Sequence, residues 1–358
     1  MTLTGAASSM TAETFIAQLT SAIGASGLWV VSHDLSTLYA LGDGPIDSVE
    51  DEGLIDSLLG GQSAELAGET YVPILSGRFP LLTATGLSPA TLPDDVSALV
   101  GPVAEFHRDL FDGLEAKRRR GMFTPEAQLQ WSLLPLRAAI VGDLEVAGAL
   151  LPAASVAGDA YDFAVTPSGR LTVLAMDAMG HGVTATLSTS LALATMRTVR
   201  RSGGSLLEQV SAADEAVLKE YSGDRFITMA AVEMAEDAIL VINAGHEPIR
   251  RLSPTGGVAA LDVSADPPLG LDGLSDYRVQ EIDRLEVGEA LALLSDGAPE
   301  ARGIDGTVFG EDAVNDALES LRGAAALQTA NRIGRAIMKF IPGELTDDLT
   351  TVVVQRNA

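Results

Sequence analysis

The sequence contains no cysteine, which excludes disulfides, thiolate zinc sites and cysteine nucleophiles. It also lacks any run of 18 apolar residues without polar breaks, so we expect no membrane span. The N-terminus has neither the basic nor the apolar region of a signal peptide, which predicts a cytoplasmic protein. A multi-histidine zinc centre is not expected, because the chain has only four widely spaced histidines: His33, His107, His181 and His246.

Positive charge is scarce as well. Twenty-three lysines and arginines face 49 aspartates and glutamates, and the formal net charge of the chain is −26. Such a surface repels nucleic acid and anionic lipid, so neither is an expected partner. It also repels a phosphorylated substrate unless cations neutralise the site, although a merely soluble acidic surface explains the charge equally well. Hydrophobic residues make up 47% of the 358 residues, which predicts folded domains, two or three in number.

Residues 1–101 predict a small α+β domain. Its expected order is a helix, two strands, a second helix and a hairpin, and this order and size resemble sensory domains of the GAF or PAS type. An unspecialised docking or dimerisation domain fits the pattern equally well. The expected elements are a helix at 11–23, strands at 27–31 and 37–41, a helix at 51–59, and strands at 69–75 and 79–85.

A helical linker is expected at 94–134. Its first helix, 94–120, has apolar residues every three or four positions, as in a coiled coil, and this predicts a homodimer. A helix packed on its own domain is the alternative. A second helix, 125–134, begins with Thr124 as N-cap and Pro125 at the first helical position. The seam consists of Val96, Leu99, Val103, Phe106, Leu110 and Leu114.

Four acidic segments stand beside apolar stretches that predict β-strands. A carboxylate next to a buried strand needs a reason, because an unpaired buried charge costs free energy. A single aspartate of this kind is explained by a turn or a helix cap, but four together are not. Carboxylate oxygens are the ligands that Mg²⁺ and Mn²⁺ prefer, so the pattern predicts a metal-dependent hydrolase. The segments are GDAYD (158–162), DAMGHG (177–182), SDG (295–297) and DDLT (347–350).

These segments, together with NAGH at 243–246, resemble the PP2C-like (PPM) bacterial serine/threonine phosphatases of the SpoIIE, RsbU and RsbP type. The resemblance runs from about residue 125 to 355, in the family's order and spacing. It implies an α/β/β/α sandwich at 135–358, made of two mostly antiparallel sheets with paired helices outside. The whole chain is then an α+β protein: a sensory domain, a helical linker and a phosphatase domain.

The resemblance also implies a site for two divalent cations, Mn²⁺ or Mg²⁺. Asp177 is expected to bridge the two ions, and the backbone carbonyl of Ala178 to bind one of them. Asp296 and Asp347 are expected to complete the second ion, and Asp159 to face the first, directly or through water.

Three further residues are weaker candidates. Asp348 adjoins Asp347, and adjacent strand residues point to opposite faces, so only one of them can face the ions; we prefer Asp347. Asp162 is either a ligand or a turn residue. His181 is either a general acid or a hydrogen-bond partner of the backbone in a glycine-flanked turn.

The implied substrate is a phosphoserine or phosphothreonine on a STAS-domain anti-sigma factor antagonist, in a stress-response or developmental pathway. Regulation is expected from the N-terminal domain, on which an upstream activator would act. The alternative function is a non-catalytic module that keeps the phosphatase fold as a signalling scaffold. A carboxylate-bound metal nuclease is disfavoured by the charge of −26.

Overall fold

The computed structural model forms two compact units, 1–122 with 136–139, and 123–135 with 140–358. The expected helix at 94–120, with its seam, lies outside the described residues, as does most of the helix at 125–134. No helix in the described part of the chain is long and apolar enough to cross a membrane. The structure describes residues 12–31, 37–41, 48–59, 62–74, 82–86, 133–135, 137–153, 157–271, 276–341 and 345–357.

The first unit contains one antiparallel sheet, with strand order β3-β2-β1-β6-β5-β4. The helices and longer strands follow the expected order, while β3 and β4 are too short to show a period in the sequence. The GAF or PAS resemblance stays a prediction. The elements are α1 (Ala12–Ile23), β1 (Gly27–Val31), β2 (Leu38–Leu41), β3 (Ser48–Val49), α2 (Glu52–Leu59), β4 (Ala64–Leu66), β5 (Glu69–Ile74) and β6 (Leu82–Thr85).

The second unit is built on two antiparallel sheets that face each other, since β10 contacts β16 and β17. The first sheet has strand order β15-β12-β11-β10-β9. Its strands are β9 (Ala160–Val165), β10 (Leu171–Ala178), β11 (Ile227–Met234), β12 (Ala238–Ala244) and β15 (Gln280–Asp283). The second has order β14-β13-β16-β17-β8-β7. Its strands are β7 (Ala138–Val141), β8 (Leu144–Leu151), β13 (Arg250–Ser253), β14 (Gly257–Ala260), β16 (Ala290–Leu294) and β17 (Leu349–Arg356).

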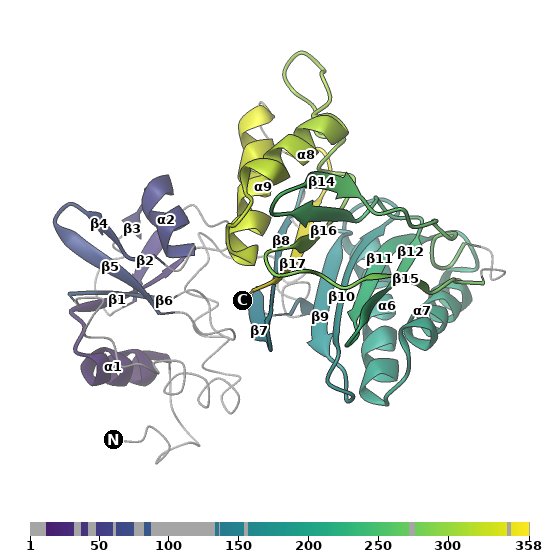
Figure 1. Cartoon of the computed structure of the whole chain (residues 1–358), viewed down its shortest axis with the longest axis horizontal. Coiled ribbons are helices and arrows are strands. Elements are labelled where there is room, and N and C mark those ends of the chain that lie inside the picture. Colours follow the sequence, from purple (N-terminus) through teal and green to yellow (C-terminus); the bar gives the residue numbers. More distant parts are fainter. Residues whose placement is uncertain are drawn as a thin grey trace. The chain divides into compact units, whose positions relative to one another are not determined.

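Two helices cover the outer face of each sheet. Helices α6 (Val183–Arg201) and α7 (Leu206–Tyr221) pack on the first sheet, as Figure 1 shows. Helices α8 (Gly310–Ser320) and α9 (Ala326–Phe340) pack on the second. The expected α/β/β/α sandwich is therefore present. The chain turns between β7 and β8 at Gly142, which adopts a left-handed φ of 63°.

Strand β10 of the first sheet lies between helix α6 and the second sheet, and residues 171–176 are all buried. Its side chains alternate between the faces of the sheet. Leu174, Met176 and Ala178 belong to the apolar cluster formed with α6 and α7. Asp177 therefore points the other way, toward the second sheet.

Asp162 lies on the helix-covered face of the same sheet. It pairs with Leu174 across β9 and β10, and its carboxylate binds two arginines of α6. Asp162 Oδ1 is 2.7 Å from Arg197 Nη2, and Oδ2 is 2.8 Å from Arg200 Nη2. The structure thus separates Asp162 from the other acidic residues, because its place in the pleat is opposite to that of Asp177. It attaches α6 to the sheet.

We expect Asp162→Ala to lower the free energy of unfolding by about 3–5 kcal/mol, because Arg200 would stay buried without its carboxylate. Urea unfolding measures the change. The matched control is Asp143→Ala, which removes a pair with Arg356 at the surface and should change stability much less. Equal losses in the two variants would contradict this role of Asp162.

Candidate metal centre

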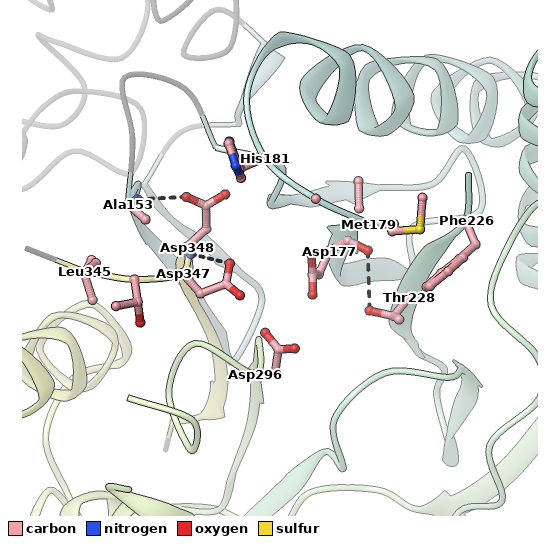
Figure 2. A pocket seen from close by; sticks show the side chains of 13 residues that line it. Ala153, Asp177, Met179, His181, Phe226, Thr228, Asp296, Leu345, Asp347 and Asp348 are labelled. Atoms are coloured by element: carbon pink, nitrogen blue, oxygen red, sulfur yellow. Dashed lines mark hydrogen bonds between the residues drawn. The ribbon is translucent and has the colours of Figure 1, made fainter. Parts of the chain in front are cut away.

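A cavity of about 470 Å³ opens where β10, β16 and β17 present their ends. Asp177 is the next-to-last residue of β10, Asp296 follows β16, and Asp347 precedes β17 by two residues. Figure 2 shows these three carboxylates turned toward one another across the cavity. Segments far apart in the sequence are thereby brought to one point at the edge of the sandwich.

Asp177 is positioned by the turn that follows it. Gly180 and Gly182 have φ values of 85° and 80°, a conformation that side chains with a Cβ rarely adopt. The amide of Met179 donates to the carbonyl of Phe226 at 3.1 Å, which ties the turn to the start of β11. Ala178 ends the strand and lines the cavity.

Asp296 is brought to Asp347 by a close backbone approach. A Cβ on Gly297 would lie 2.0 Å from the carbonyl oxygen of Asp348, so only glycine fits there. Ser295 secures the same junction: its amide donates to the Thr350 carbonyl at 3.0 Å, and its Oγ accepts from the Thr350 amide at 2.8 Å. The sequence SDG therefore joins the end of β16 to the beginning of β17.

The two adjacent aspartates differ in their surroundings. Asp348 is buried, and its carboxylate accepts from the amides of Ala153 at 2.8 Å and Gly158 at 2.6 Å. These bonds fasten the connection between β8 and β9 onto β17. Asp347 is exposed and faces Asp177 and Asp296 across the cavity (Figure 2). Asp348 thus has a structural task, and Asp347 is the one directed at the other carboxylates.

Burial and mutual repulsion raise the pKa values of the acidic residues here. Burial, and then the charges of Asp296, Asp347 and Asp348, raise the pKa of Asp177 to about 7. Burial and then the nearby Asp177 raise the pKa of Asp159, and burial and then Asp347 raise that of Asp296. Of the described residues that line the cavity, none is a lysine or an arginine. The site therefore lacks a protein cation to balance its charge.

Divalent cations fit this donor set. Asp296 Oδ1 is buried without a hydrogen-bond partner, as expected of an oxygen that serves as a ligand. Within the described parts of the chain, no three acidic, histidine or cysteine side chains are already arranged to hold one ion by themselves. Mg²⁺ and similar ions commonly take only one or two carboxylates each and keep several waters. Carboxylates spread around a cavity of about 470 Å³, which also has room for water, meet that requirement.

His181 and His246 differ in their burial. His181 is exposed and lines the cavity. His246 is buried, and burial lowers its pKa to about 4, so the ring is neutral. Its Nδ1 is hydrogen-bonded to Thr228 Oγ1 at 2.8 Å, and Thr228 in turn donates to the carbonyl of Asp177 at 3.5 Å. His246 therefore supports the backbone behind Asp177 from within the sandwich.

A family model described as Stage II sporulation protein E (SpoIIE) matches residues 167–357, just over half of the chain. The chain belongs to the SpoIIE family. This membership makes it a PP2C-type (PPM) protein serine/threonine phosphatase. The match covers Asp177, Asp296 and Asp347, while Asp159 lies before its first residue. The comparison with curated proteins found no match.

Solved structures share the fold of the phosphatase domain. The SiaA-PP2C domain of Pseudomonas aeruginosa aligns with a TM-score of 0.55 and 21% identity, over 64% of this chain and 93% of that one. The RsbU and RsbW domains of Rv1364c from Mycobacterium tuberculosis align at 0.50 and 21%, over 61% and 63%. The SpoIIE phosphatase domain with a regulatory fragment, from Bacillus subtilis, aligns at 0.50 and 18%, over 60% and 62%.

The sequence did not single out an acidic group beside the SpoIIE-type site. Glu247 follows His246, and burial, and then the charge of Glu311, raise its pKa to about 7. Arg250, which is buried in β13, forms an ion pair with Glu311. Nothing in the sequence marks this ion pair, because Glu311 lies 61 positions away from Arg250.

We expect substitutions of Asp348 and Asp347 to affect different properties of the protein. Asp348→Ala should lower the free energy of unfolding by about 2 kcal/mol or more, because it leaves two backbone amides without acceptors. Asp347→Ala should change stability by only about 0.5 kcal/mol, since the residue is exposed, but should weaken Mn²⁺ binding. Urea unfolding and calorimetric titration with MnCl₂ measure the two effects. The reverse pattern would assign the metal to Asp348.

Proposed function

We propose that this phosphatase hydrolyses phosphoserine or phosphothreonine on a STAS-domain anti-sigma factor antagonist, with the carboxylates of the cavity holding two divalent cations. The convergence of Asp177, Asp296 and Asp347 carries the proposal. Fold similarity to the RsbU and SpoIIE domains supports the substrate class, because these domains are of the branch of phosphatases that the sequence resembles.

Each residue has a task in this scheme. Asp177 would hold both ions, the carbonyl of Ala178 one of them, and Asp296 with Asp347 the other. Asp159 would face the first ion, directly or through water. When bound, the cations lower the pKa of a shared water and offset the phosphoryl charge. The acidic walls hold them, and the cavity admits a phosphorylated side chain. His181, exposed at the same cavity, is placed to give a proton to the leaving oxygen.

We expect Asp177→Asn and Asp296→Asn to reduce Mn²⁺-dependent hydrolysis of p-nitrophenyl phosphate to background while the proteins stay folded. Each change removes a negative oxygen ligand and a source of repulsion at once. Initial rates with MnCl₂, and thermal unfolding of each variant, measure the two effects.

The matched control is Asp237→Asn, an exposed aspartate in the turn between β11 and β12, which should keep full turnover. Undiminished turnover in Asp177→Asn would contradict the role of Asp177, whereas no turnover by the unmodified protein would favour the scaffold alternative, a module without catalysis. Release of phosphate from a phosphorylated STAS-domain protein, compared with an unrelated phosphoserine protein at the same low enzyme concentration, tests the substrate class. Equal rates on both would contradict it.

The N-terminal unit is proposed to regulate the phosphatase through dimerisation. A chain shortened to begin at Met122 should differ from the full chain in both turnover and mass in solution. Helix pairs that rearrange between two packings are a common route for such control. Turnover with p-nitrophenyl phosphate and light-scattering mass measure the two properties. A shortened chain with the same activity and the same mass would count against regulation from this unit.

A further inference from the structure

A second cavity, of about 220 Å³, adjoins the metal cavity. Leu345, Thr346 and Asp347 line both of them, so one short segment is their common wall. Figure 2 shows Leu345 and Asp347 next to each other at one side of the metal cavity. A substrate whose phosphoryl group reaches the carboxylates has neighbouring residues within reach of this second cavity.

Arg302 is the cationic residue among those that line the second cavity. It is exposed, and it forms no ion pair with the described carboxylates, unlike Arg278, which binds Asp266, or Arg251, which binds Glu289. An uncommitted guanidinium beside the active site is unusual in a chain with a net charge of −26. It remains available for a ligand that comes from outside the chain.

The backbone around Arg302 is held firmly. The amide of Gly303 donates to the Thr307 carbonyl at 2.8 Å, and the amide of Phe309 donates to the Ala301 carbonyl at 2.8 Å. The rings of Phe309 and Phe340 pack edge to face with centroids 5.2 Å apart, which attaches this hairpin to α9. Arg302 is thus presented from a preorganised loop, and binding there costs little ordering of the backbone.

We propose that Arg302 is a specificity residue that binds the carboxylate of an aspartate or glutamate flanking the phosphorylated residue of the substrate protein. The proposal rests on the proposed function. Arginine suits this task because its planar guanidinium binds a carboxylate through two parallel hydrogen bonds.

The phosphoryl group itself is not the partner, for two reasons. Arg302 lines the second cavity and not the one that contains Asp177 and Asp296. Glu300 lines the same cavity as Arg302, and its negative charge opposes a dianionic phosphate more strongly than a single carboxylate. Glu300 and Asp347 are the acidic residues of the lining, so an acidic side chain would be bound at the guanidinium of Arg302 rather than by the cavity as a whole.

Two phosphoserine peptides test the proposal on the full chain, one with aspartates flanking the phosphoserine and one with alanines. The unmodified protein should have a KM roughly 10-fold lower for the acidic peptide, the effect of about one charge-assisted hydrogen bond. Arg302→Ala should remove that difference and leave kcat unchanged. Turnover of p-nitrophenyl phosphate, which has no flanking residue, should stay the same in this variant.

A charge-reversal variant and a matched control test the proposal further. Arg302→Glu should prefer a third peptide with flanking lysines, which separates recognition from mere packing. Arg322→Ala removes an exposed arginine of the same domain that pairs only with Glu319, and should behave as the unmodified protein. The proposal is overturned if Arg302→Ala keeps the peptide preference, or if it lowers kcat on p-nitrophenyl phosphate. No turnover of p-nitrophenyl phosphate by the unmodified protein would instead contradict the proposed function, and this proposal with it.

Discussion

Four aspartates, Asp159, Asp177, Asp296 and Asp347, converge at one edge of the sandwich, and their mutual repulsion opposes folding. Burial alone disfavours a charged carboxylate, and each neighbouring carboxylate adds to the effect, as the raised pKa of Asp177 shows. A chain that needed only stability would separate them. Keeping them together requires that the surrounding backbone be fixed by interactions that do not depend on the carboxylates' own pairing.

Those interactions lie in the junctions between strands. Gly297 allows the chain after β16 to touch the carbonyl of Asp348, and Ser295 joins the same two segments through hydrogen bonds. Asp348 binds the backbone that leads from β8 to β9, and so fixes the approach to Asp159. On the outer face, Asp162 and the arginines of α6 hold the helix that follows Asp177. The segments SDG and DDLT therefore each combine a carboxylate that faces the cavity with a residue that holds the backbone.

Periodicity in the sequence was sufficient for the long elements. The helices expected at 11–23 and 51–59 appear as α1 and α2, with N-terminal bounds that differ by one residue. The alternation of side chains along a strand also predicted that Asp347 and Asp348 point to opposite faces. It could not predict that Asp348 accepts from amides nearly 200 positions away, or that Asp162 meets arginines of a later helix. Such partners depend on which strands pair, and a single sequence does not specify that pairing.

Metal binding requires negative charge at the site, whereas recognition of an acidic substrate requires positive charge beside it. In the proposed scheme the carboxylates bind cations only when deprotonated, so protons and divalent ions would compete for Asp177, whose pKa is raised to about 7. Metal binding would thus weaken as the pH falls through that value, and bound ions would offset the mutual repulsion of the carboxylates. The rest of the surface remains acidic and repels other anions. Under those conditions a single unpaired arginine at the edge of the site discriminates strongly, because few other positions nearby attract a carboxylate.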